Sequence, residues 1–196
     1  MNSTTRQPWL LLIYRVPQEP PGRRTYVWRH LKQLGALYLQ QAAGILPDRP
    51  ELRSGLATLA AWIRDVQGEV SLLETASPDA GWQQALTQRF CQASDAEYAE
   101  LVETVERFED EIRRESRKGK FTFAELAELE ADGEKLQRWR AQISARDFFA
   151  APGRQEGEAA LERGRLALDA FAATVEAHEH PAEDEEDAHA QQQAPG

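Results

Sequence analysis

A cluster of cations near the N-terminus is the first feature of this sequence that could do chemistry. The cluster consists of Arg23, Arg24, Arg29 and Lys32, and Arg15 precedes it at the end of an apolar run. Guanidinium groups bind phosphate and other tetrahedral oxyanions in bidentate fashion. A helix that begins near this point would add backbone N–H donors and a favourable dipole. Three interpretations follow: nucleic-acid binding, oxyanion binding, or a solvated helix face with salt bridges inside the chain.

A second cationic cluster lies in the middle of the chain, in the stretch "RRESRKGK". Its members are Arg113, Arg114, Arg117, Lys118 and Lys120. The stretch ends a helical pattern, where cations interact favourably with the helix dipole. That structural interpretation competes with a second one, in which the cluster forms a phosphate-contacting tip of a helical hairpin.

The other reactive side chains form no recognisable catalytic or metal-binding set. Cys91 is the single cysteine and shares a helical pattern with apolar residues, which favours packing. The histidines show no His-Glu-x-x-His or Cys-His spacing. His178 and His180, beside Glu179 and Glu183, could hold a metal weakly, but the acidic composition of this stretch favours a solubilising role. We therefore predict no metal, no cofactor and no enzymatic activity.

The first part of the chain shows a βαββαβ pattern. The apolar run 9–16 indicates a strand buried on both faces, and a helix over 23–34 should present Val27, Leu31 and Leu34 to the core and end at Gly35. Trp28 is also expected to pack in the core. Two short strands, "ALYLQ" and "AGILP", precede a strongly amphipathic helix that ends at Gly68, and "EVSLLET" gives a fourth strand. These elements predict an α+β fold, a ferredoxin-like βαββαβ sandwich over residues 8–79.

The second part of the chain is helical. Ser94-x-x-Glu97 and Thr122-x-x-Glu125 are two potential capping boxes, each followed by a helical apolar pattern, and a third such pattern follows Pro152–Gly153. We expect a bundle of about three antiparallel helices over residues 80–178. The stretch 179–196 is acidic, poor in apolar residues and expected to be disordered.

Charge is distributed unevenly between these parts. Residues 1–80 carry nine Lys/Arg and seven Asp/Glu, whereas residues 81–196 carry fourteen Lys/Arg and twenty-six Asp/Glu. The net charge of the whole chain is −10. The lone cysteine excludes an intramolecular disulfide, and the N-terminal apolar run is too short for a transmembrane helix. A cytoplasmic protein without membrane contact is expected.

Several separated blocks carry a family resemblance. They are "WLLLIYRVPQEPPGRRTYVWRHLKQLGALYLQQAAGILPD", "WIRDVQGEVSLLET", "RRESRKGKFTFAELAELEADGEKLQRWRAQI" and "DFFAAPGRQEGEAAL". In this order they resemble the N-terminal domain of the ChrB chromate-resistance proteins, over roughly residues 9–175. The resemblance implies regulation of a chromate-efflux operon. Family members often continue into a chromate-associated domain, so sensing of chromate could belong to a separate partner.

A fainter likeness rests on the pattern R-x-x-x-W-R-x-L-x-x-L-G, Arg24 to Gly35. It is similar to the ferredoxin-like domain of phenylacetate-catabolism repressors and to small CRISPR-associated nucleases of that fold. The nucleases need an acidic residue just after the first strand to hold a divalent cation, and this chain has Arg15-Val16-Pro17-Gln18 there.

Three functional hypotheses follow. The first is a homodimeric, DNA-associated regulator of chromate resistance that contacts an operator through its cationic helix surfaces. The second is a protein-interaction module without DNA contact. The third is direct binding of an oxyanion such as chromate, whose tetrahedral oxygens resemble those of phosphate.

Overall fold

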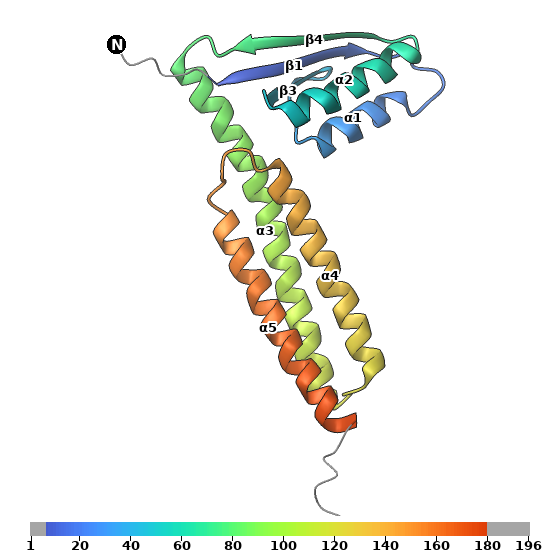
Figure 1. Cartoon of the computed structure of the whole chain (residues 1–196), viewed down its shortest axis with the longest axis vertical. Coiled ribbons are helices and arrows are strands. Elements are labelled where there is room, and N and C mark those ends of the chain that lie inside the picture. Colours follow the sequence, from blue (N-terminus) through green and yellow to red (C-terminus); the bar gives the residue numbers. More distant parts are fainter. Residues whose placement is uncertain (1–6, 180–196) are drawn as a thin grey trace, which may run out of the picture. The chain divides into compact units, whose positions relative to one another are not determined.

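The computed structural model describes residues 7–179, which fold as a βαββαβ unit followed by three helices (Figure 1). The elements are β1 (Pro8–Arg15), α1 (Arg23–Gln33), β2 (Leu37–Gln40), β3 (Ala43–Pro47), α2 (Pro50–Asp65), β4 (Glu69–Ala76), α3 (Ala80–Lys118), α4 (Phe123–Arg146) and α5 (Arg154–Glu179). The predicted α+β class is therefore confirmed. No helix within residues 7–179 is both long enough and apolar enough to cross a membrane.

The four strands form one antiparallel sheet in the order β2-β3-β1-β4. Strand β1 lies in the middle, where Leu12 pairs with Gly44 of β3 on one side and with Leu72 of β4 on the other. The connections β1-α1-β2 and β3-α2-β4 each pass over one strand of the sheet, which is the split βαβ arrangement expected from the sequence.

Helices α1 and α2 cover one face of this sheet, which we call the inner face (Figure 1). Side chains alternate along a strand, so Leu10, Leu12 and Tyr14 of β1 all point to the same face. They are buried against Leu31 of α1 and Leu56 of α2, which lie on the apolar stripes of their helices. This packing is the larger of the cores around the sheet.

The outer face of the sheet is covered at one end only. Trp9 and Ile45 are buried there against Leu86 and Phe90 of α3. Further along β1, Ile13 is 43% exposed. The prediction that the first strand is buried on both faces is therefore wrong for its second half, because no helix covers that part of the outer face among residues 7–179.

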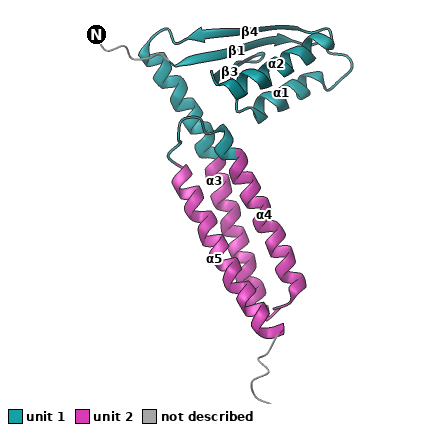
Figure 2. Ribbon diagram, in the orientation of Figure 1, with its two compact units in different colours: residues 1–96, 143–152 teal, residues 97–142, 153–196 magenta. Residues whose placement is uncertain are grey.

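The chain divides into two compact units, coloured separately in Figure 2. Unit 1 contains residues 1–96 and 143–152, and unit 2 contains residues 97–142 and 153–196. The segment 143–152 is tied into unit 1 by Arg49, whose Nη2 donates to the Phe148 carbonyl at 2.7 Å and whose guanidinium lies over the Phe148 ring. The domain bounds 8–79, 80–178 and 179–196 stay predictions, and the tail beyond Glu179 lies outside the described residues.

The predicted apolar pattern that follows Ser94 lies on α3 and contributes to the core of unit 2. All of its members are buried: Tyr98, Leu101, Val105, Phe108 and Ile112. The predicted cap at Thr122 is confirmed, since its Oγ1 accepts from the Glu125 N–H at 3.3 Å. The predicted cap at Ser94 is wrong, because α3 already begins at Ala80 and Ser94 is buried inside it.

Candidate anion-binding site

Helix α1 begins without a capping side chain. Its N-cap is Gly22, whose φ of 98° suits glycine, and the first turn carries no acidic residue. The first intrahelical bond here runs from the Tyr26 N–H to the Gly22 carbonyl at 2.8 Å. The N–H groups ahead of it have no acceptor within the helix, so this end offers donors and the positive pole of the helix dipole to an anion.

The first cationic cluster surrounds this helix end and continues along α1. Arg24, Arg29 and Lys32 are exposed, while Arg23 is half-buried and donates from Nη1 to the Glu19 carbonyl at 2.8 Å. Within residues 7–179, none of these four cations forms an ion pair with a carboxylate. The internal salt bridges of the structural interpretation are therefore absent from this cluster within residues 7–179, while a solvated helix face and a partner-binding surface both stay open.

Two cavities meet beside the cluster. The larger, of about 680 Å³, lies between the end of β1, the start of α1, the β2–β3 turn and the start of β4; it is lined by residues that include Arg15, Arg23, Arg24 and Glu69. The smaller, of about 400 Å³, extends along α1 and is lined by residues that include Thr25 and Trp28. Both are lined by Tyr14, Arg24 and Gln41, so the two cavities are neighbours that share these three residues.

The shared wall of the cavities is a small polar network. The Tyr14 and Tyr38 hydroxyls lie 3.4 Å apart, and the Arg24 Nη2 donates to the Gln41 Oε1 at 3.3 Å. Burial, followed by the hydrogen bond to Tyr14, raises the pKa of Tyr38 above its usual value. Tyr38 therefore stays protonated at neutral pH, and it presents a hydroxyl rather than a phenolate to the cavity.

Trp28 lies at the edge of this site and not in the core. Its side chain is 46% exposed and lines the smaller cavity, so the prediction of a buried Trp28 is wrong. The buried stripe of α1 contains Val27 and Leu31. Trp28 follows Val27 directly and so points about a quarter turn away from that stripe, beyond the part of the helix that the sheet covers.

Four of the five cations in the second cluster are paired with carboxylates. Arg113 pairs with Asp110 at 2.6 Å, and Arg114 pairs with Glu111 at 2.6 Å. Lys120 pairs with Glu125 at 2.9 Å across the α3–α4 turn. Arg117 forms no ion pair with any residue of the described range.

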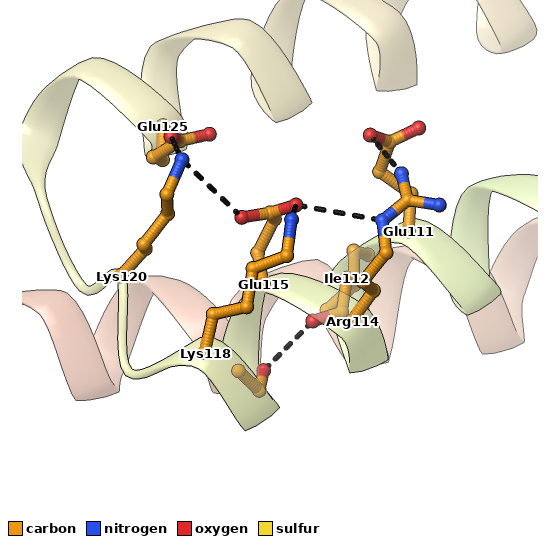
Figure 3. A network of polar contacts seen from close by, with 8 residues as sticks. Glu111, Ile112, Arg114, Glu115, Lys118, Lys120 and Glu125 are labelled. Carbon is orange, nitrogen blue, oxygen red and sulfur yellow. Dashed lines mark hydrogen bonds and ion pairs between the residues drawn. The ribbon is translucent and has the colours of Figure 1, made fainter.

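Glu115 is the centre of this second cluster (Figure 3). Its side chain is 7% exposed, and its carboxylate lies 2.8 Å from the Lys118 Nζ, 3.5 Å from the Arg114 Nε and 3.8 Å from the Lys120 Nζ. The hydrogen bond from Lys118 is the main reason why the pKa of Glu115 is lowered. The arrangement supports a structural role, in which one carboxylate holds the helix end and the following turn together.

Replacing Glu115 with glutamine should remove a pH-dependent part of the stability. Because the folded state lowers the pKa of Glu115, its contribution is complete above the unfolded pKa of about 4.3 and is lost as pH falls through the lower, folded value. We expect Glu115→Gln to lower the melting temperature at pH 7 and to differ little from the parent chain near pH 3. Thermal denaturation between pH 3 and pH 7 measures this.

Glu103→Gln is the matched control, because Glu103 is exposed on the same helix and forms no ion pair within residues 7–179. A Glu115→Gln melting curve that stays parallel to that of the parent chain at every pH would contradict the structural role.

The remaining reactive residues stay apart from the site. Burial, with the charges of Asp147 and Asp95, raises the pKa of the Cys91 thiol, which disfavours the nucleophilic thiolate. Within residues 7–179 no group of three His, Cys, Asp or Glu side chains is placed to hold a metal ion. His180 and Glu183 lie outside the described residues.

Comparison with known proteins identifies the family. The sequence profile described as "Protein ChrB, N-terminal" matches residues 24–182, which is most of the chain. The chain belongs to the ChrB family. It is thus a protein related to chromate resistance, as the sequence blocks suggested. A "Protein ChrB" of Cupriavidus metallidurans is 29% identical over 182 residues.

The alignment with that ChrB protein covers 81% of this chain and 53% of the relative. The chain therefore spans about half the length of the curated ChrB protein that it matches. The family profile begins at Arg24, so the matched region includes Arg24, Arg29 and Lys32 and leaves Gly22 and Arg23 outside.

Sequence reasoning found the cations of the site and missed its neutral polar groups. Tyr14, Tyr38 and Gln41 come from β1, β2 and the β2–β3 turn, and no local pattern marks them. The one usable signal was the alternation of β1, which places Tyr14 on the inner face two residues beyond Leu12.

Proposed function

We propose that this chain is a non-enzymatic regulatory protein of chromate resistance that associates with duplex DNA through the exposed side of α1. The observation that carries the proposal is the contrast between the two cationic clusters. Arg29 and Lys32 are exposed and have no carboxylate partner within residues 7–179, whereas most cations of the second cluster are paired with carboxylates. Unpaired Arg and Lys side chains on one helix are what phosphate contacts require.

The net charge of −10 opposes approach to DNA at long range. Salt screens exposed charges beyond about 10 Å at 0.1 M ionic strength. Close to α1, its own cations and the positive pole at Gly22 attract a phosphate. Because phosphate contacts release counterions, affinity of this kind must fall steeply as salt rises.

The double variant Arg29→Gln/Lys32→Gln tests this function. We expect its affinity for a promoter duplex of the chromate-efflux operon to fall about 10-fold at low salt. The dependence of that affinity on salt should also become shallower, with a slope smaller by roughly one for each phosphate that the variant no longer neutralises. Fluorescence anisotropy with a labelled duplex, over a series of salt concentrations, measures both quantities.

The matched control is Lys135→Gln/Arg138→Gln, which removes one Lys and one Arg from exposed positions on α4 and makes the same change in net charge. Equal losses of affinity in the two double variants would point to net charge rather than to the α1 surface. Absence of any duplex binding by the parent chain at micromolar concentration would refute the proposed function.

The homodimer and a separate chromate-sensing partner stay predictions. The exposed Ile13 and Leu73 on the outer face of the sheet favour self-association, since they belong to adjacent strands on an uncovered surface.

A further inference from the structure

The two adjacent cavities beside α1 are each larger than a bare oxyanion needs. Their volumes are about 680 Å³ and about 400 Å³, and pockets for small organic ligands measure about 300–1,000 Å³. The larger cavity is lined by arginines and forms a cationic end, whereas the smaller is lined by Trp28 and forms an aromatic end. Arg24 lines both cavities. The pair of cavities thus suits a ligand with a charged head joined to a flat ring.

The cationic end offers donors of several kinds to an anion. Arg23 and Arg24 line the larger cavity at the uncapped start of α1, where backbone N–H groups have no acceptor within the helix. Glu69 also lines this cavity and would repel an anion. Glu69 lies across from Arg15 on the neighbouring strand, so the charged head of a ligand should lie at the α1 side.

The wall near the residues that the two cavities share adds two phenolic hydroxyl groups, those of Tyr14 and Tyr38. Tyr14 is 6% exposed, and its hydroxyl contacts the Tyr38 hydroxyl at 3.4 Å. When one hydroxyl donates to the other, the second hydrogen of the pair is left for a third group. A phosphate ester or a ribose oxygen can accept it, whereas a cation cannot.

The aromatic end is formed by Trp28. Its indole is 46% exposed and lines the smaller cavity together with Thr25 and Gln40. Bases stack on exposed aromatic rings in many nucleic-acid-binding proteins, and this stacking tolerates every base because each has a π-face. Gln40 and Gln41 supply amide groups beside the ring.

We propose that these two adjacent cavities together bind a nucleoside phosphate that reaches across Arg24, with the phosphate at Arg23, Arg24 and the start of α1 and the base on Trp28. This ligand is distinct from duplex DNA, whose bases are paired and stacked and cannot reach Trp28. Arg29 and Lys32 line neither cavity, so the nucleotide site and the exposed DNA surface can be tested separately.

Isothermal titration calorimetry on the full chain tests the proposal with AMP, dTMP, inorganic phosphate and adenosine. We expect AMP and dTMP each to bind about 10-fold or more tightly than either inorganic phosphate or adenosine, because both ends of the site contribute. Equal affinity for AMP and inorganic phosphate would reduce the site to an oxyanion site and overturn the proposal. Equal affinity for AMP and adenosine, or no binding by any of the four, would also overturn it.

Variants locate the two halves of the ligand. Trp28→Ala should weaken AMP binding about 10-fold and leave phosphate binding unchanged, and Trp28→Phe should restore most of the affinity. Arg24→Gln should weaken the binding of both AMP and phosphate. AMP affinity that is unaffected by Trp28→Ala would refute the base position, and Trp28 is exposed enough for that variant to fold.

The failure of this proposal is distinguishable from failure of the proposed function. Arg29→Gln/Lys32→Gln should weaken duplex binding and leave AMP binding unchanged, whereas Trp28→Ala should do the reverse. A loss of AMP affinity in Arg29→Gln/Lys32→Gln equal to that in Arg24→Gln would overturn the assignment to the cavities.

Discussion

Replacing Trp9 with alanine is expected to lower the free energy of unfolding of unit 1 by about 3–5 kcal/mol. Trp9 is fully buried, and its ring is stacked on Phe90 with 5.7 Å between centroids. Its Nε1 donates to the buried Ser77 Oγ at 2.9 Å. The substitution thus leaves a cavity and an unpaired hydroxyl together, on the outer face of β1.

Trp28→Ala is the control within the same unit, because it removes the same side chain from a position that is 46% exposed. We expect it to change the free energy of unfolding by about 0.5 kcal/mol or less. Urea denaturation followed by tryptophan fluorescence suits this comparison, since Trp9, Trp28, Trp62 and Trp82 belong to unit 1 and Trp139 to unit 2. Equal losses of stability in the two variants would contradict the burial of Trp9.

Gly68→Ala is expected to destabilise unit 1 by about 1–3 kcal/mol. A Cβ at this position would lie 2.7 Å from the Arg15 carbonyl oxygen and 2.9 Å from the Ile63 carbonyl oxygen. Both contacts are to backbone atoms, so a side-chain rotation cannot relieve them. The urea midpoint of unfolding measures the destabilisation.

Gln67→Gly makes the opposite change at the adjacent position. Gln67 has a φ of 61°, a conformation that glycine adopts without the steric cost of a Cβ. We expect Gln67→Gly to raise the free energy of unfolding by up to about 1 kcal/mol. If Gly68→Ala proved neutral while Gln67→Gly destabilised unit 1, the geometry of this turn would be wrong.

This turn shows how a correct prediction can rest on a different cause. The sequence predicts that Gly68 ends α2, and α2 does end just before it, at Asp65. The left-handed residue that stops the helix is Gln67, and Gly68 is required because β1 passes close to it. The proximity of Arg15 is a long-range contact, which no local pattern could have revealed.

Helix α3 shows the opposite case, in which a local pattern misleads. Ser94-x-x-Glu97 matches a capping box, but Ser94 lies inside a helix of 39 residues. Asp79 lies just ahead of α3 instead, where its Oδ1 accepts from the Trp82 N–H at 2.8 Å. A serine has some tolerance for helix interiors, so the motif alone does not decide where a helix begins.

The sequence alone determined the order of the elements, the apolar stripes of α1 and α2, the two cationic clusters and the family. These depend on residues that are close in sequence or on several blocks in a fixed order, and Val27 and Leu31 lie on the buried side of α1 as their spacing requires. The sequence also predicted the ferredoxin-like strand arrangement, because few connections are available to a βαββαβ chain.

Tertiary structure decided part of the charge pairing, since Arg113 and Arg114 pair locally within α3 whereas Lys120 pairs across a turn. Lys120 meets Glu125 because the α3–α4 turn brings the two together, and no such turn brings a carboxylate to Arg29 or Lys32 within residues 7–179. Tertiary structure also brought Tyr14 to Tyr38, 24 residues apart, and left Trp28 at the surface. The physical reason is that a periodic pattern reports the face of one element, whereas charge pairing and cavity walls depend on which elements fold side by side.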